Sequence, residues 1–332
     1  MALNSCFEVF CLSESIDKMP EMVKKDLIDL RAALDHDLPP KIPDSNVLIA
    51  TWNLRMFGNI TESWVGKPHA SPVRNWHAIA CIKEIVSRFD VIAIQEVRSN
   101  LRGLRHLLKM LGGNWSFLMT DVTKGSDGNF ERMAFLFDTR KVGLSGLACE
   151  LVVPPEQLAS IAPDALTRQF ARTPYAVSFW SGGRTFILVT LHVKYGQPKE
   201  RIPELKAIAA WMSDWAKDIN SWDHNLITLG DFNIDRQNDD MYKAFMSTNL
   251  HVPEGLMGVP RSIFDKPNKK HFYDQIAWFD KGANVPSLSL KYKSSGYFDF
   301  TQTAMNTLNL TKQELSFRIS DHFPLYAEFD PR

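Results

Sequence analysis

The stretch LITLGDFNID, residues 226–235, places polar side chains where a buried strand should stop. Its apolar run reaches Gly230 and is followed at once by Asp231 and Asn233. Side chains two residues apart share a face of an extended chain, so an extended backbone here would present a carboxylate beside a carboxamide. The carboxylate only accepts hydrogen bonds, whereas the amide both donates and accepts them. Such a pair suits metal or phosphate chemistry.

Five further apolar segments end or begin in residues of the same kind. A single Asp, Asn or His at such a place is more often a turn or structural residue. Six such places in one chain are hard to explain by turns alone, because a core has no need to collect acids, amides and two histidines. The further residues are Asn53, Gln95 with Glu96, His192, Asp274, and Asp321 with His322.

Together these residue types support metal-assisted phosphoryl chemistry. Mg²⁺ prefers oxygen ligands and is typically held by one or two carboxylates together with a substrate phosphate, a role that suits Glu96 and Asp321. A histidine moves protons best when a carboxylate fixes its tautomer, and Asp274 could orient His322 in this way. Arginines can grip a phosphate through two parallel hydrogen bonds.

Strand and helix patterns alternate along the chain and must position these side chains. Two segments, RNWHAIACIKEIVSRF and PELKAIAAWMSDWAKDI, are predicted to be amphipathic helices, and the second places Leu205, Ile208, Met212, Trp215 and Ile219 on one face. Strands dominate, which predicts sheet-on-sheet packing covered by helices in one domain, residues 47–332. The predicted strands are NVLIATWNL, DVIAIQEV, RMAFLFD, YAVSFW, TFILVTLHV, NLITLGDF, YDQIAWF and FPLYAEF.

Residues 1–46 are predicted to form an N-terminal appendage that is partly helical. The segment PEMVKKDLIDLRAAL carries Met22, Leu27, Leu30 and Leu34 near helical spacing, and Pro20 suits a first turn. Three prolines in DLPPKIPDSN then end the helix. The appendage could dock a protein partner, which the sequence does not identify, or cap the fold, and capping is favoured.

Composition excludes several classes of protein. With 45% hydrophobic and 23% charged residues the 332-residue chain is typical of globular proteins, and its formal net charge of +0 provides no global basic field, although a local patch remains open. Cys6, Cys11, Cys81 and Cys149 show neither a C-x-x-C pair nor zinc spacing. The N-terminus lacks the basic region of a signal peptide. No apolar run approaches the roughly 18 residues of a membrane span, so we expect a cytoplasmic protein without membrane association.

The polar strand ends occur in an order that resembles the endonuclease/exonuclease/phosphatase superfamily, and within it the deoxyribonuclease I branch. The resemblance runs from about Val47 to Phe329. LGDFN is its most specific motif, whereas the other motifs are strong evidence only in combination. These are WNLRMFGN, AIQEVR, FERMAFLFD, FARTPYAV, VTLHV, YDQIAWF and ISDHFPLYAEF.

This resemblance implies a four-layered α/β-sandwich, in which two mixed β-sheets pack face to face with helices outside and the active site lies where the strand ends converge. It implies roles for three groups of residues. The implied catalytic residues are His192, supported by Glu131, and His322, Asp274, Asp231 and Asn233; the implied phosphate-binding residues are Arg172, Arg55, Arg98 and Asn53; the implied metal ligands are Glu96, Asp321 and Asn53. Which histidine is the base and which the acid stays open.

The expected activity is that of a phosphodiesterase dependent on Mg²⁺, with Mn²⁺ as a substitute, that cuts nucleic acid. A DNA endonuclease of low sequence specificity is favoured. The alternative is a phosphoesterase on the same fold that acts on a phospholipid, an inositol phosphate or a nucleotide, although YDQ differs from the WCDR pattern typical of inositol phosphatases. A binding protein with a decayed site is disfavoured, because no implied catalytic position has lost its chemistry. Asn129 replaces a tyrosine that contacts the DNA minor groove in the DNA-cutting branch, so groove contact would differ.

Overall fold

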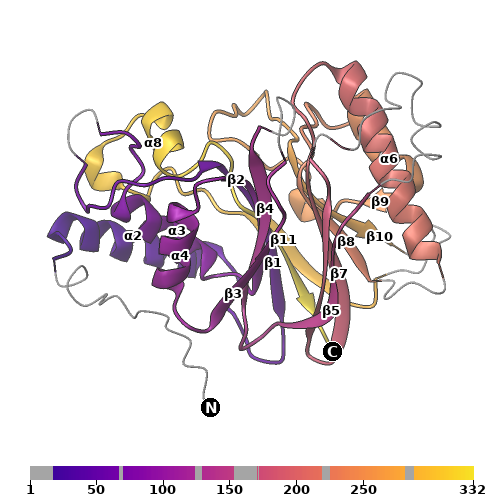
Figure 1. The fold of residues 1–332 in the computed structure, drawn as a ribbon, viewed down its shortest axis with the longest axis horizontal. Coiled ribbons are helices and arrows are strands. Elements are labelled where there is room, and N and C mark those ends of the chain that lie inside the picture. The colour runs from indigo at the N-terminus through magenta and orange to yellow at the C-terminus, as the bar shows by residue number, and fades with distance from the viewer. Residues whose placement is uncertain are drawn as a thin grey trace, which may run out of the picture.

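Two six-stranded sheets pack face to face, and helices cover their outer faces (Figure 1). The structure, a computed structural model, describes residues 18–66, 70–123, 129–152, 170, 172–218, 225–280 and 288–332. Of the residues named above, Ile219, Cys6 and Cys11 lie outside this part. The architecture is the four-layered α/β-sandwich expected from the sequence, and that prediction is confirmed.

The first sheet has the strand order β11-β12-β1-β2-β4-β3. The pairing of β1 with β2 is parallel and the other pairings are antiparallel, so the sheet is mixed. The strands run over β1 Val47–Phe57, β2 Val91–Arg98, β3 Trp115–Met119, β4 Glu131–Asp138, β11 Lys291–Tyr297 and β12 Leu325–Asp330.

The second sheet has the order β5-β6-β7-β8-β10-β9, and here β7 and β8 form the parallel pair. Each sheet therefore has one parallel pair near its middle, and these two pairs carry residues of four of the predicted motifs. The strands run over β5 Gly143–Glu150, β6 Tyr175–Ser181, β7 Arg184–His192, β8 Leu226–Asp231, β9 Leu250–His251 and β10 Asp274–Phe279.

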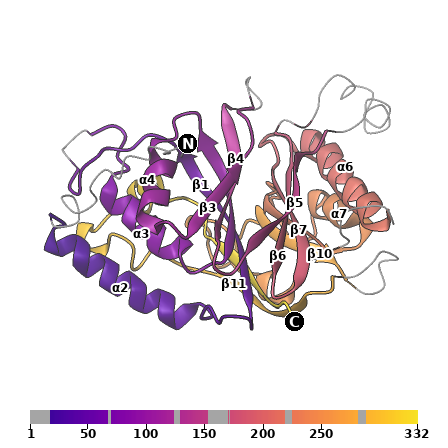
Figure 2. The same ribbon diagram turned by 60° about the horizontal axis from the view of Figure 1, so that its bottom comes forward.

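Helices form the two outer layers (Figures 1 and 2). On the first sheet lie α2 Glu21–Asp37, α3 Trp76–Val86 and α4 Arg102–Leu111, and on the second lie α6 Pro198–Lys217 and α7 Asp240–Phe245. A further helix, α8 Lys312–Arg318, precedes β12, and 3₁₀ turns cover Met246–Thr248, Glu254–Leu256 and Asn306–Leu308. Within the described residues no helix has the length and apolar character needed to span a membrane.

A small polar network lies between the sheets and fixes how they face one another. The side-chain amide of Gln95 on β2 donates to the Thr190 hydroxyl on β7 at 3.0 Å and to the Thr51 hydroxyl on β1 at 3.1 Å. All three residues are fully buried, so the network is costly to break. Because they precede Glu96, His192 and Asn53 by one or two residues, it holds the two sheets together directly beneath those side chains.

Helix α2 packs onto the outer face of the first sheet. Its side chains Val23, Leu27, Leu30 and Leu34 are buried in the same hydrophobic cluster as residues of β1 and α3. At its surface, Arg31 Nη2 lies 2.6 Å from a carboxylate oxygen of Glu84 on α3. We infer that the helical part of the N-terminal segment caps this layer.

Leu30→Ala tests that inference. Leu30 is fully buried, so its truncation should lower the free energy of unfolding by about 2–5 kcal/mol, as is usual for a core leucine. Ile28→Ala on the exposed face of the same helix is the control and should change it by less than about 0.5 kcal/mol. Urea unfolding followed by circular dichroism measures both. A loss for Leu30→Ala as small as that of the control would remove α2 from the core.

Candidate active site

Strand β8 brings Asp231 to the sheet edge by running unusually close to its neighbour. Gly230 has φ +141, and a Cβ at this position would lie 2.1 Å from the carbonyl oxygen of Leu191 on β7. The glycine does not end the strand. Instead, the strand continues to Asp231, and the glycine allows the close approach of two parallel strands.

The backbone is not extended at Asn233, so the condition under which Asp231 and Asn233 would share a face is not met. Asn233 has φ 51, in the left-handed region that Asn tolerates better than most residues. This bend lets the backbone N–H of Asn233 donate to Asp231 Oδ1 at 2.9 Å, while its side-chain amide donates to the carbonyl of Val193 at 2.7 Å. Asn233 thus fixes the orientation of Asp231.

The second oxygen of Asp231 is the meeting point of three side chains. Asn53 Nδ2 on β1 donates to Asp231 Oδ2 at 3.1 Å. The Nε2 atoms of His192 and His322 lie 3.6 Å and 3.9 Å from the same oxygen. Asp231 is almost fully buried. Residues from both sheets and from the loop before β12 therefore converge on one carboxylate.

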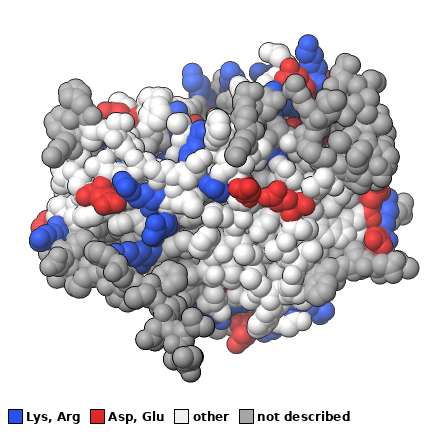
Figure 3. All heavy atoms as spheres, viewed as in Figure 1, with Lys and Arg blue, Asp and Glu red and all other residues white. Residues whose placement is uncertain are grey.

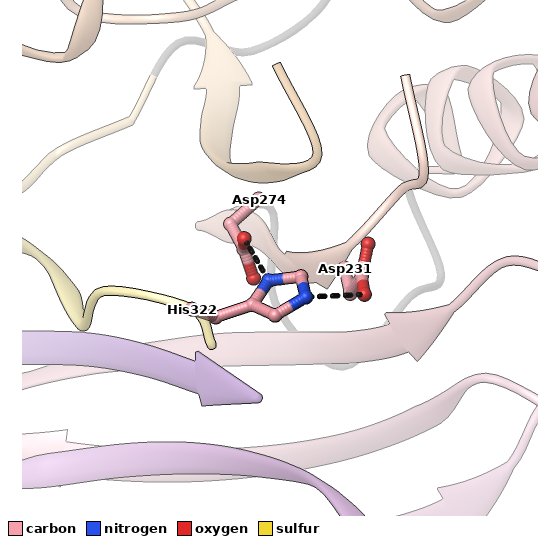
Figure 4. Close-up of side chains that lie close together, drawn as sticks. All are labelled: Asp231, Asp274 and His322. Atoms are coloured by element: carbon pink, nitrogen blue, oxygen red, sulfur yellow. Dashed lines mark hydrogen bonds and ion pairs between the residues drawn. The ribbon is translucent and has the colours of Figure 1, made fainter. Parts of the chain in front are cut away.

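His322 is tied to a buried acid on its other side (Figure 4). Its Nδ1 lies 2.6 Å from Asp274 Oδ2, and Asp274, the first residue of β10, is fully buried. Burial raises the pKa of Asp274 to about 6 against the opposing charge of His322. Burial would lower the pKa of His322, but the charge and hydrogen bond of Asp274 outweigh it and raise that pKa well above the ordinary value. The pair therefore retains a proton on the imidazole at neutral pH.

His192 belongs to a second histidine–carboxylate pair. Its Nδ1 lies 3.2 Å from Glu131 Oε2, and the same oxygen lies 2.8 Å from Arg172 Nε. The side-chain amide of Asn129 donates to Glu131 Oε1 at 2.5 Å, and Arg98 Nη2 lies 3.5 Å from that oxygen. His192 is only 5% exposed, so its side chain is almost entirely shielded from solvent.

Glu96 lies beside this centre in a strained stretch of β2. It has φ 62, and the pairing of β1 with β2 shifts register between Asn53 and Phe57. Glu96 accepts hydrogen bonds from Asn53 Nδ2 at 3.0 Å and from the Met56 backbone N–H at 2.7 Å. Burial would raise the pKa of Glu96, but nearby His192 and these hydrogen bonds outweigh it, so the pKa is lowered. The carboxylate is therefore ionised.

Asp321 and Arg55, for which the resemblance implies different roles, pair with each other. Arg55 Nη1 lies 3.0 Å from Asp321 Oδ2 and donates to the Ser316 hydroxyl at 2.8 Å. The guanidinium also lies over the ring of Phe317, 4.1 Å from its centroid. The implied metal ligand and the implied phosphate-binding residue thus neutralise one another.

The oxygen atoms present fit a hard divalent cation. The side-chain amide of Asn53 donates to both Glu96 and Asp231, and Glu96 is ionised. Carboxylate oxygens of this kind are ligands that Mg²⁺ prefers. Among the described residues, Asp231, Asp274 and His322 also bring one potential ligand atom each within 4.8 Å of one another. The proton held by His322 against Asp274 makes that group better suited to proton transfer than to metal binding.

Three buried arginines support the site and were missed in the sequence analysis. Arg74 donates to the carbonyls of Leu54, Arg55, Met56, Arg318 and Ile319, at 2.8–3.3 Å, and so joins the end of β1 to the turn before His322. Arg201 on α6 pairs with Asp235 at 2.9 Å and donates to the Asn233 carbonyl. Arg261 donates to the Asp274 carbonyl at 3.0 Å. Each is a lone arginine in its segment, and no local pattern distinguishes it from a surface residue.

The family model of the endonuclease/exonuclease/phosphatase family matches residues 50–307, which is most of the chain. The chain belongs to this family. Members of this family are hydrolases that act on phosphoester bonds.

Two relatives are deoxyribonucleases. The chain is 24% identical to deoxyribonuclease gamma of Mus musculus over 291 residues, which covers 83% of this chain and 82% of the relative. It is 26% identical to deoxyribonuclease-1 of Bos taurus over 289 residues, which covers 83% of this chain and 90% of that protein. The predicted resemblance to the deoxyribonuclease I branch is therefore confirmed.

Solved structures with the same fold have diverse substrates. A mannosyl-6-phosphatase from Bacteroides thetaiotaomicron superposes with a TM-score of 0.56 at 18% identity, over 85% of this chain and 99% of that one. TDP2 of D. rerio, complexed with a single-strand DNA product, superposes with a TM-score of 0.54 at 14% identity, over 86% of this chain and 99% of that one. At these identities the likeness establishes the fold alone.

The Asp274–His322 contact predicts how His322 titrates. In the wild type the imidazole should stay protonated well above pH 6.5, the ordinary value for histidine. In Asp274→Asn the carboxylate is lost while burial remains, so the pKa of His322 should fall below the wild-type value by at least about one unit. NMR titration of the ring protons in metal-free protein measures this shift, with His36 on α2 as an internal reference that should not change. An unaltered His322 titration would show that Asp274 does not hold the proton.

Proposed function

We propose that the protein is a divalent-metal-dependent phosphodiesterase and, most specifically, a DNA endonuclease of low sequence specificity. The observation that carries the proposal is the convergence of two histidine–carboxylate pairs on Asp231, at 3.6 Å and 3.9 Å. Cleavage of a phosphodiester needs one group that takes a proton from water and another that gives a proton to the leaving oxygen. Two supported imidazoles around one acid meet that need.

A metal ion would be held by Glu96 with Asn53, and Asp321 is a further candidate ligand once released from Arg55. When bound, Mg²⁺ or Mn²⁺ would neutralise charge on the scissile phosphate. Glu96 suits this role because it is ionised and already oriented by two hydrogen bonds. The family relationship supports a divalent metal, and the oxygen ligands favour Mg²⁺.

The protein's own groups would divide the remaining work. His322, backed by Asp274, and His192, backed by Glu131, would hold and transfer the two protons, and Asp231 would orient water between them. Arg172, together with Asn53 and Asn233, would grip phosphate oxygens and stabilise the charge that develops in the transition state.

A nucleic-acid substrate is favoured over a small phosphoester by the two deoxyribonuclease relatives. In the view of Figure 3, charges of both signs are scattered over the surface without one large basic field, in keeping with the net charge of zero. Binding of a nucleic acid would therefore depend on arginines of the candidate site, namely Arg55, Arg98 and Arg172. The same fold acting on a phospholipid, inositol phosphate or nucleotide is the alternative.

A cytoplasmic location completes the proposal. Cys81 and Cys149 are free, and burial raises the pKa of both thiols, which keeps them unreactive. Free cysteines of this kind are typical of reducing compartments.

Glu96→Gln tests the metal site, because it removes the charge and keeps the size of the side chain. The variant should need at least about tenfold more Mg²⁺ for half-maximal activity, since a neutral amide is a weaker ligand for a hard cation. EDTA should abolish wild-type activity, and Mg²⁺ or Mn²⁺ should restore it. Glu21→Gln at the start of α2 is the control and should need the same Mg²⁺ concentration as the wild type for half-maximal activity. Full activity of dialysed wild type in EDTA would refute metal dependence.

Plasmid cleavage separates a nuclease from a phosphomonoesterase. Supercoiled plasmid should become nicked, then linear, then fragmented, and the rate should fall as salt rises because phosphate contacts release counterions. Arg172→Ala should lose most of the rate, at least about tenfold, whereas Arg184→Ala, at the opposite end of β7 from His192, should keep it. Intact plasmid after long incubation, together with rapid phosphate release from an inositol phosphate, would favour the alternative.

A further inference from the structure

Exposed apolar side chains adjoin the charged residues of the site. Four of the large hydrophobic residues that reach solvent are close, in sequence or by contact, to a proposed site residue. They come from four separate segments, so one local sequence feature does not explain them. We propose that these side chains form a stacking platform, Met56, Phe130, Tyr195 and Phe317, which binds unpaired bases on either side of the scissile phosphate. This inference rests on the proposed function and names its substrate class: single-stranded nucleic acid.

Phe130 stands at the His192 side of the site. It directly precedes Glu131, has φ 56, and its side chain is 55% exposed. Two hydrogen bonds hold the residue before Phe130. Arg98 donates to the Asn129 carbonyl, and the side-chain amide of Asn129 donates to Glu131 at 2.5 Å. Holding a phenylalanine in the left-handed region and in water is unfavourable for folding. Its position is better explained by contact with a ligand.

Met56 and Phe317 stand at the Glu96 side. The backbone N–H of Met56 donates to Glu96 at 2.7 Å, while the side chain is 56% exposed. Phe317 on α8 is 43% exposed and lies against the guanidinium of Arg55, which in turn pairs with Asp321. An arginine stacked on an aromatic ring next to a phosphate site offers both a flat surface for a base and a charge for the backbone.

Tyr195 stands at the Asp231 side. It follows His192 by three residues, is 68% exposed, and has the guanidinium of Arg201 5.5 Å from its ring. Tyr195 also acts electrostatically on Tyr273 and helps to raise the pKa of that residue, after burial as the larger cause. Tyr273 lies 5.8 Å from the ring of His322. Tyr195 is therefore linked to His192 by sequence and, through Tyr273, to the His322–Asp274 pair.

Flat apolar surfaces interleaved with arginines are the means by which proteins bind single strands without sequence preference. In an intact duplex the bases are stacked on one another and cannot reach such surfaces. The tyrosine that contacts the minor groove in the DNA-cutting branch is Asn129 here, and the neighbouring Phe130 offers a ring without a hydroxyl. Both features favour binding to unpaired bases over binding in the minor groove of a duplex.

A binding experiment tests the platform without turnover. The full chain carrying His192→Gln, in EDTA, would be titrated against fluorescein-labelled DNA of about 12 nucleotides, a length within the usual range of single-strand sites. Three probes share the same backbone length: a mixed-sequence single strand, its duplex, and an abasic single strand. The single strand should bind at least about tenfold more tightly than the other two, because only it offers free bases for stacking.

Phe130→Asn combined with Phe317→Gln, in the same His192→Gln background, should lose most of that preference and leave abasic binding unchanged. Asn tolerates the backbone conformation of Phe130, and Gln suits the helix of Phe317. Trp180→Thr is the control: Trp180 is equally exposed but pairs with Thr185, seven residues and roughly 23 Å along β7 from His192. It should keep the preference. Thermal unfolding would confirm that all variants fold.

The outcomes distinguish the two proposals. Equal binding of the single strand and the abasic strand, or a loss of preference in Trp180→Thr as large as in the double variant, would overturn the platform. Tighter binding of the duplex would overturn it as well. If one of these results is obtained and the wild type nevertheless cuts plasmid, the proposed function is retained and the stacking platform is rejected. If the wild type cuts no nucleic acid, the proposed function fails, whatever the binding shows.

Discussion

The buried carboxylate of Asp231 is the constraint on which the rest of the structure depends. A charge removed from water costs several kcal/mol unless hydrogen bonds and opposite charges compensate it. Asp231 obtains this compensation from Asn53 on the first sheet, from the Asn233 backbone on the second, and from the two histidines. No single sheet could supply these partners. Burial of Asp231 together with its partners therefore requires both sheets, and the two sheets must pack in one relative position.

Several features enforce that register. Gln95 links β1, β2 and β7 through buried hydroxyls beneath the site, and Gly230 lets β8 approach β7 closely enough to align Asp231 with His192. Arg74 then fixes the bent end of β1 to the turn before His322. Burial lowers the pKa of Arg74 to about 10, so the guanidinium remains charged at neutral pH and all its bonds persist. The strained backbone at Arg55 and Glu96 is thus held by its surroundings.

How much could be predicted from the sequence depended on how deeply each element is buried. The eight predicted strands are the interior strands of the two sheets, whereas the missed strands, β3, β5, β9 and β11, are the four edges. Interior strands bury both faces and form continuous apolar runs, but an edge strand such as β11, KYKSSGY, carries polar residues that hide it. The candidate site residues were predicted from short motifs, because each motif contains its own polar residue types. The bend at Asn233, the pairing of Asp321 with Arg55, and the buried arginines depend on carbonyls and charges from distant segments, which no local pattern contains.

The charge pairs of the candidate site also indicate how phosphate and cation would bind. Arg55, a proposed phosphate-binding residue, pairs with Asp321, a proposed metal ligand, so each is already occupied by a partner of opposite sign. A phosphate attracts the arginine, and a divalent cation attracts the acid. Each therefore releases the partner that the other requires, and the binding of phosphate and cation should be mutually favourable. The same exchange would allow a chain with no net charge to bind a phosphate, because positive charge is available in ion pairs at the candidate site.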